Sequence, residues 1–145
     1  MSEKQESLKA AAGFYCLEDI KSVELAQGIK MQLFSGENVM MSFVTLEPGA
    51  LVPLHSHPHE QMGTVLEGEF IFYIGGLAEE NGKRVTKGDI YLAPGGVLHA
   101  ARSIGDKPCL TLDIFGPIRE DYIAMFKTTH GHEVSGLQVS EQEQK

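Results

Sequence analysis

The sequence lacks several features that define common classes of protein. It contains no tryptophan and only two cysteines, Cys16 and Cys109, in 145 residues, so a disulfide framework is excluded as the basis of its stability. Both cysteines have apolar neighbours, and we expect both to be buried, reduced thiols. No apolar run approaches the roughly 20 residues needed to cross a bilayer, and the polar N-terminal residues lack the apolar core of a signal peptide. We therefore expect a cytoplasmic protein with no membrane partner.

Positive charge is also scarce. The chain has 12 lysines and arginines against 20 aspartates and glutamates, which gives a formal net charge of −8. Binding of nucleic acid phosphates needs a basic surface, so this balance argues against a nucleic-acid partner. A small anionic substrate would be repelled at long range. Its binding would therefore need a local cation, either a metal ion or an arginine.

What the sequence does contain is a succession of short, apolar or β-branched segments separated by turns, with 16 glycines in all. This pattern predicts an all-β fold, a sandwich or barrel, in one domain that spans residues 14–135. Residues 1–13 are expected to be a flexible or helical lead-in, with helix favoured over residues 8–12, and residues 136–145 a disordered tail. The expected strands span residues 28–34, 39–46, 62–66, 69–74, 83–86, 90–93, 98–103 and 108–115.

Two finer features are expected within this all-β domain. The pair Glu67-Gly68 lies between two of the expected strands and predicts a hairpin that joins them. After the last expected strand, Tyr122, Ile123 and Phe126 recur at helical intervals, so residues 119–127 predict a short C-terminal helix.

Histidines in two separate segments carry the first functional signal. His55 and His57 lie two residues apart, and side chains at that spacing point to the same face of a strand. Gln61 follows in the same segment, and His99 lies in a later one. Two imidazoles that project together, with a third from elsewhere, suit a divalent metal ion.

Two neighbours compete with Gln61 as the fourth ligand. Glu60 lies one residue earlier, and in a regular strand it would face away from a metal that Gln61 faces. His59 lies two residues after His57 and is a further candidate. Pro58 disturbs the alternation of the strand, so both alternatives stay open at this point.

Glycines and a proline lie at fixed intervals around these histidines. The first segment carries Gly49, His55, His57, Gln61 and Gly68, and the second carries Gly88, Pro94, Gly96 and His99. This double pattern resembles the cupin superfamily, whose motifs run Gly-x5-His-x-His-x3,4-Glu-x6-Gly and Gly-x5-Pro-x-Gly-x2-His-x3-Asn. The resemblance implies a single-domain cupin β-barrel, or jelly roll. Gln61 stands where most cupins carry glutamate, and Ser103 where many carry asparagine.

The run His55-Ser-His-Pro-His-Glu-Gln61 resembles a narrower group, the pectin-degradation cupins. These are small metal enzymes that convert 4,5-unsaturated monouronates to linear keto forms. The resemblance implies one divalent ion (nickel, zinc, iron or manganese) held by His55, His57, Gln61 and His99, a sugar-acid substrate, and a homodimer. With four neutral ligands the ion would keep its full charge and favour Lewis-acid chemistry on oxygen substrates.

The same cupins carry an Asp-x-Phe-x3-Arg element, which this sequence matches with Asp113, Phe115 and Arg119. Asp113 interrupts an apolar run, so it is a candidate acid or base if it faces a cavity, or a solvent-facing strand residue if it does not. Arg119 is a candidate clamp for a substrate carboxylate, or a helix-start residue paired to Glu120 or Asp121. Phe115 is a candidate cavity wall or a core residue.

Two other functions fit the same ligands. The chain could be a different metal-dependent cupin enzyme, such as a dioxygenase or a polyketide-type cyclase, or it could be a ligand-binding cupin without catalytic activity. In the first case an apolar pocket would be lined by Met40, Met41, Phe43, Phe70 and Phe72.

Overall fold

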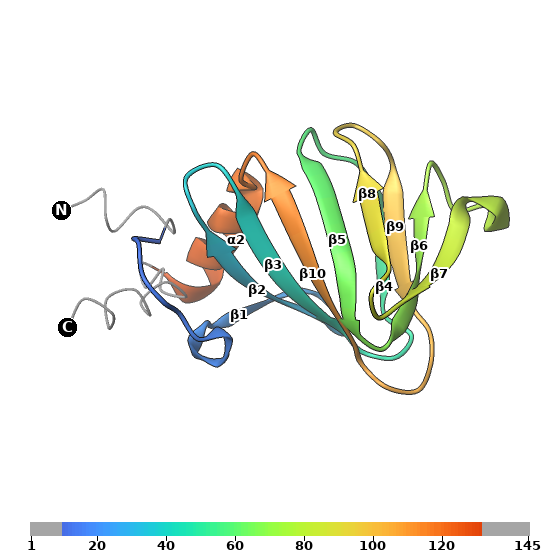
Figure 1. Ribbon diagram of the computed structural model, residues 1–145, viewed down its shortest axis with the longest axis horizontal. Coiled ribbons are helices and arrows are strands. Elements are labelled where there is room, and N and C mark those ends of the chain that lie inside the picture. Colours follow the sequence, from blue (N-terminus) through green and yellow to red (C-terminus); the bar gives the residue numbers. More distant parts are fainter. Residues whose placement is uncertain (1–9, 132–145) are drawn as a thin grey trace.

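Two antiparallel β-sheets face each other in the computed structural model, which describes residues 10–131 of the chain (Figure 1). One helix follows the last strand and ends the described part. The predicted all-β fold with a short C-terminal helix is confirmed. In spatial order, the first sheet consists of β1 (Ser22–Ala26), β2 (Ile29–Ser35), β3 (Met40–Leu46), β10 (Cys109–Gly116), β5 (Glu60–Glu67) and β8 (Ile90–Ala93).

The second sheet has four strands, and it supplies the other wall of the barrel. Short 3-10 helices, η1 (Leu17–Asp19) and η2 (Glu79–Asn81), precede β1 and β7. In spatial order, this sheet consists of β4 (Leu51–His55), β9 (His99–Ser103), β6 (Glu69–Ile74) and β7 (Gly82–Thr86).

Alternating side chains explain why the first sheet buries one face. Along β2 and β3, buried residues alternate with more accessible ones, because successive side chains of a strand point to opposite faces. The buried set forms one continuous core between the sheets. Its largest fully buried side chains include Phe70, Phe115, Phe126, Ile29 and Met31.

The predicted hairpin at Glu67-Gly68 is wrong. β5 and β6 belong to different sheets, so the chain crosses from one sheet to the other at this point. Gly68 has a φ of +85°, and a Cβ there would lie 2.8 Å from the carbonyl oxygen of Pro108. A glycine is required because the crossing brings two backbones together with a left-handed φ.

The strands β1 and β4 were not among the expected strands. Both are short, and β4 contains Pro53, which breaks the usual strand pattern. The helix expected over residues 8–12 is absent from its described part, because residues 10–13 form no helix. Residues 1–9 and the tail expected at 136–145 lie outside the described residues.

The cysteines differ in their surroundings. Cys109 is buried, as expected, but Cys16 is exposed, and the two thiols are unpaired. The expectation for Cys16 is wrong because the segment before η1 lies on the surface rather than under the sheet.

The helix α2 (Glu120–His130) begins one residue after Arg119 and packs Tyr122, Ile123 and Phe126 into the core. Acidic residues lie in its first turn and Lys127 and His130 in its last, the arrangement that the helix dipole favours. Among residues 10–131, no helix combines the length and apolar character required to span a bilayer.

Candidate metal centre

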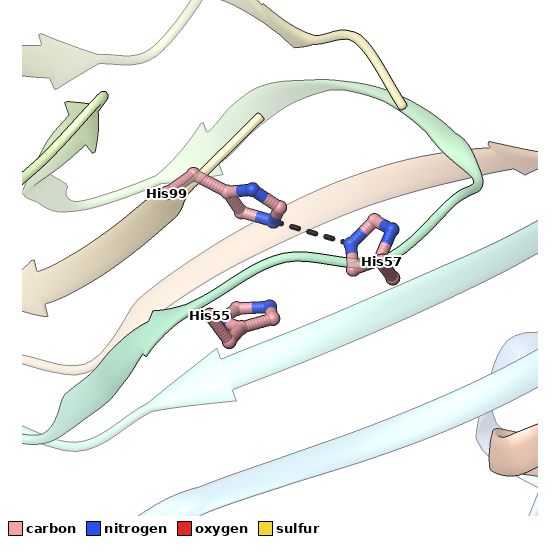
Figure 2. Close-up of side chains that lie close together, drawn as sticks. All are labelled: His55, His57 and His99. Atoms are coloured by element: carbon pink, nitrogen blue, oxygen red, sulfur yellow. Dashed lines mark hydrogen bonds between the residues drawn. The ribbon is translucent and has the colours of Figure 1, made fainter. Parts of the chain in front are cut away.

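Three histidines from three parts of the fold meet at one end of the barrel. His55 ends β4, His57 lies in the connection to β5, and His99 begins β9, where it pairs with His55 across the ladder. Their nearest nitrogen atoms all lie within 4.8 Å of one another. Figure 2 shows the three rings turned toward each other. His57 lies beyond the end of β4. The path of the connection to β5 therefore places His57 beside His55, and the expected alternation of side chains along one strand is not the reason.

Gln61 joins the histidines from β5, where its side chain is buried. Its Oε1 lies 3.1 Å from Nε2 of His57 and 3.1 Å from Nε2 of His99. The two nitrogens lie 3.2 Å apart, the contact drawn as a dashed line in Figure 2. These three atoms therefore form a nearly equilateral triangle. We call His55, His57, Gln61 and His99 the acceptor cluster.

The other nitrogen of each ring fixes its tautomer. Nδ1 of His55 lies 2.8 Å from the carbonyl oxygen of Pro53, and Nδ1 of His99 lies 2.9 Å from that of Val97. Nδ1 of His57 lies 3.1 Å from the carbonyl oxygen of His59. A carbonyl oxygen only accepts, so we assign the proton to Nδ1 in all three rings. Each neutral ring then presents a bare lone pair at Nε2.

A proton between Nε2 of His57 and His99 would require one ring to be a charged imidazolium. Burial, with the positive charge of Arg119 and the neighbouring imidazoles, lowers the pKa of His57 to about 4, and burial also lowers the pKa of His99. Near neutral pH both rings are therefore neutral. Three lone pairs then converge with no proton among them, an arrangement that a cation stabilises.

The spacing fits such an ion. Ligand atoms at about 2.0–2.2 Å from a metal, at tetrahedral or octahedral angles, lie about 2.8–3.6 Å from one another. The triangle of 3.1 and 3.2 Å falls in this range. The acceptor cluster can therefore hold a divalent ion, and its nitrogen and amide oxygen donors do not select one metal.

The two competing ligands stay outside the cluster. Glu60 is exposed while Gln61 is buried, as strand alternation requires. The ring of His59 lies 5.5 Å from that of His57, centroid to centroid, and His59 does not belong to the group of converging nitrogens among the described residues.

Asp113 points into the barrel. It lines an inner chamber of about 50 Å³ together with His55, Gln61 and His99, so the solvent-facing alternative is wrong. The hydroxyl of Tyr91 donates a 2.6 Å hydrogen bond to Oδ1 of Asp113. Gln61 lines the same chamber as Asp113 and turns its oxygen to the histidines.

Gly63 makes room for this pair. It lies between Asp113 on β10 and Tyr91 on β8 in the same cross-strand row. A Cβ at Gly63 would collide with Oδ1 of Asp113 and lie 2.6 Å from ring carbons of Tyr91. Because Gly63 has no side chain, the hydroxyl of Tyr91 and the carboxylate of Asp113 can meet above β5.

Burial raises the pKa of Asp113 to about 6, and hydrogen bonds from Tyr91 and Gln61 and the charge of Arg119 oppose the rise. A carboxyl group with a pKa near 6 exchanges its proton close to neutral pH, which is the property of a general acid or base.

Arg119 and Phe115 lie beside the cluster. Phe115 is buried, lines the inner chamber, and meets the ring of His57 edge-on at 5.8 Å. Arg119 is also buried, with its guanidinium 3.8 Å from the centre of the Tyr122 ring. Its Nε and Nη2 donate to the two carboxylate oxygens of Asp121 at 3.0 and 2.7 Å. The predicted pairing with a helix-start carboxylate is thus present.

An outer cavity of about 320 Å³ adjoins the inner chamber. Arg119 and Asp121 line it, and His55 and Tyr122 line both spaces. A volume of about 300 Å³ or more is typical of small-molecule sites. Through His55, the acceptor cluster therefore reaches the wall of a cavity of ligand size.

The sequence analysis missed Tyr91 and Gly63, whereas it named Asp121 as a candidate partner of Arg119. No local pattern marks Tyr91 or Gly63, because their relation to Asp113 depends on the register of three strands. Of the five side chains expected for an apolar pocket, Phe70 and Phe72 line the chamber, while Met40, Met41 and Phe43 do not.

The comparison with protein families matches residues 42–115 to the Cupin domain. The chain belongs to the cupin family. Among solved structures, this cupin resembles KdgF from Halomonas sp., with 25% identity and a TM-score of 0.69 over 77% of this chain and 99% of that one. It also resembles an RmlC-like cupin from Shewanella frigidimarina, with 28% identity and a TM-score of 0.69 over 79% and 98% of the two chains.

Curated relatives of this cupin are plant proteins. It is 33% identical over 79 residues to germin-like protein 5-1 of Oryza sativa subsp. japonica and 33% identical over 85 residues to auxin-binding protein ABP19b of Prunus persica. These alignments cover 53% and 56% of this chain but 36% and 40% of the relatives. The chain thus matches less than half the length of these proteins.

We predict that Tyr91→Phe moves the pKa of Asp113 further above 6, because the phenol hydrogen bond favours the charged carboxylate. Protonation of a carboxyl with a raised pKa stabilises the folded state, so the fall in stability as the pH rises through this range should shift to higher pH. An NMR titration of the Asp113 carboxyl carbon in metal-free protein measures the change. Tyr73→Phe is the control, because Tyr73 contacts Arg102 instead. An unchanged Asp113 titration in Tyr91→Phe would contradict the assignment.

Proposed function

We propose that this cupin is a metal-dependent enzyme that converts 4,5-unsaturated uronate monosaccharides to their linear keto forms. The observation that carries the proposal is that three members of the acceptor cluster line one chamber together with Asp113: His55, Gln61 and His99. A candidate metal site and a candidate proton-transfer group are thereby adjacent. The Asp-x-Phe-x3-Arg element shared with the pectin-degradation cupins supports the choice of substrate, as does the likeness to KdgF.

In this proposal the metal ligands are His55, His57, Gln61 and His99, and the ion is nickel, zinc, iron or manganese. A bound divalent ion supplies Lewis acidity that polarises substrate oxygens. Because all four ligands are uncharged, they leave the full positive charge at the site, where it attracts an anionic sugar despite the net charge of −8.

The reaction is an isomerisation that moves one proton. The anomeric hydroxyl loses its proton, the bond between C1 and the ring oxygen breaks to leave an aldehyde at C1, and the released enolate gains a proton at C4 to become a ketone at C5. Asp113 is the group we assign to this proton transfer. Its pKa of about 6 lets it both accept and return a proton.

Arg119 is the candidate contact for the substrate carboxylate. Asp121 already occupies Nε and Nη2, but Nη1 is buried with no hydrogen-bond partner among residues 10–131. A buried, unpaired guanidinium N–H is costly, and a carboxylate oxygen would satisfy it. Asp121 and the rings of Phe115 and Tyr122 hold the guanidinium in place. The inner chamber is too small for a monosaccharide, so the sugar occupies the outer cavity and presents its reacting oxygens inward.

A second candidate is a ligand-binding cupin without catalytic activity. The likeness to auxin-binding protein ABP19b and the apolar chamber walls formed by Phe70 and Phe72 favour it. This candidate needs no proton transfer, so the role of Asp113 in turnover separates the two.

We predict that metal-free protein binds one divalent ion per chain and that His99→Ala weakens this binding by about a hundredfold or more, because one of the converging lone pairs is lost. Isothermal titration with nickel and zinc measures the affinity. His130→Ala is the control, since His130 bonds the backbone of Ser22 far from the cluster. Equal metal affinity in His99→Ala and wild type would contradict the proposed metal site.

We predict that metal-loaded protein accelerates the loss of enol-ether absorbance from unsaturated galacturonate and that Asp113→Asn slows kcat about 100-fold or more. Arg119→Lys should chiefly raise KM, because lysine cannot reproduce the fixed fork. Arg102→Lys is the control, because Arg102 is exposed and lines neither cavity. No acceleration by wild-type protein would refute the uronate assignment, and full activity in Asp113→Asn would refute the role of the carboxyl.

We also propose a homodimer, formed through the outer face of the six-stranded sheet. A row of apolar side chains crosses five neighbouring strands of this face in register: Phe34, Met41, Ile114, Met62 and Leu92. At about 4.8 Å per strand, the row is about 20 Å long. It carries no charge, so two acidic chains can meet there without opposing carboxylates.

The unpaired cysteines fit our placement of the protein in the reducing cytoplasm.

We predict that Met62→Lys yields monomers, because this substitution would bury a lysine of each chain in the apolar interface. Met62 is 43% exposed in the single chain, and Leu77, which is 53% exposed on a different surface, provides the control Leu77→Lys. Sedimentation equilibrium gives the masses. A monomeric wild type, or a dimer that survives Met62→Lys, would contradict this interface.

A further inference from the structure

A polar row crosses the floor of the inner chamber. Ser42 on β3, Asp113 on β10, Gly63 on β5 and Tyr91 on β8 occupy successive positions of one cross-strand register. The side chains of Ser42, Asp113 and Tyr91 all line the chamber. Tyr91 and Asp113 form a hydrogen bond with each other, but the hydroxyl of Ser42 has no hydrogen-bond partner among residues 10–131.

The hydroxyl of Ser42 is buried and unsatisfied. Ser42 is 1% exposed, and its Oγ has no hydrogen-bond partner among the described residues. The other inward-facing positions of β3 are Met40, Val44 and Leu46, all apolar and buried. A serine therefore interrupts an apolar face at the position beside Asp113. Buried polar groups are normally paired, so an unpaired one in a cavity wall indicates a group supplied from outside.

The position of Ser42 defines what it can reach. Directly opposed residues of neighbouring antiparallel strands have Cβ atoms about 4.5–5.5 Å apart, so one substrate oxygen can contact both the serine hydroxyl and the Asp113 carboxyl. The chamber volume of about 50 Å³ admits single polar groups and excludes a whole ring. An alanine would leave more space but offer no hydrogen bond.

We propose that Ser42 is a substrate-binding residue that determines specificity, and that its hydroxyl hydrogen-bonds a hydroxyl or carbonyl oxygen of the sugar acid at the end that reacts at Asp113. The identity of the sugar rests on the proposed function, but the recognition of an oxygen at this position does not. The serine selects ligands that carry an oxygen there, because an apolar group would leave its hydroxyl unpaired.

A second serine provides a matched control. Ser103 is 2% exposed, and its Oγ likewise has no partner among residues 10–131, yet it lines neither cavity. Removing either hydroxyl deletes the same atoms from a comparably buried site. Only the loss of the Ser42 hydroxyl should weaken the binding of a ligand.

The test compares Ser42→Ala and Ser103→Ala in two measurements. The first is isothermal titration of metal-loaded protein with galacturonate, an unreactive analogue of the unsaturated sugar. We expect Ser42→Ala to weaken binding about tenfold, the effect of one lost hydrogen bond, and Ser103→Ala to leave it unchanged. The second is urea unfolding of ligand-free protein. Here Ser42→Ala should be at least as stable as wild type, because it removes an unpaired hydroxyl.

Equal affinity of Ser42→Ala and wild type would overturn the proposal, as would an equal loss in both variants. If wild-type protein does not bind galacturonate, the proposed uronate function fails, and the stability measurement alone decides the role of Ser42. A less stable ligand-free Ser42→Ala would then show that the hydroxyl has a structural partner and overturn the inference. Unchanged or higher stability is also expected of Ser103→Ala, so it would show that the Ser42 hydroxyl has no partner within the protein, and its position in the chamber wall would then support an oxygen supplied by a ligand.

Discussion

The structure depends on the convergence of three lone pairs, from Nε2 of His57, Nε2 of His99 and Oε1 of Gln61, at separations of 3.1 and 3.2 Å. Backbone carbonyls accept a hydrogen bond from Nδ1–H of each histidine, so the rings turn acceptor nitrogens inward. Like partial charges at this distance repel unless a cation lies between them. The converging lone pairs therefore cost the fold stability, and an ion bound between them would recover it, because metal binding couples to folding.

In the proposed function, Gln61 connects the metal site with the proton-transfer group. Most cupins carry glutamate at this position, and Gln61 is the departure from the motif. A carboxylate there would repel the Asp113 carboxylate in the same chamber, whereas the amide is neutral and still offers an oxygen to an ion. The change from acid to amide would thus leave the charge of a bound ion uncompensated and allow the Asp113 carboxyl nearby. Tyr91 completes the arrangement from the opposite side.

Local patterns predicted most of the strands, because apolar segments bounded by turns carry their own signal. β6 and β8 have the predicted ends, and the helix begins one residue later and ends three residues later than predicted. The predicted hairpin at Glu67-Gly68 failed because Gly68 serves equally well in a turn or in a crossing between sheets. The spacing of His55 and His57 correctly predicted that the two side chains lie together. The inferred reason, alternation along one strand, was wrong, because His57 lies beyond the end of β4.

The sequence by itself determined the all-β class, the family resemblance and the residue types that can bind a metal, because these reside in composition, spacing and short motifs. Tertiary structure alone decided which atoms meet. The inward direction of Asp113, its contact with Tyr91 over Gly63, the pairing of Arg119 with Asp121 and the buried hydroxyl of Ser42 all follow from strand register and from how α2 packs. Register depends on pairing between residues distant in the chain, and no short stretch of sequence contains that information.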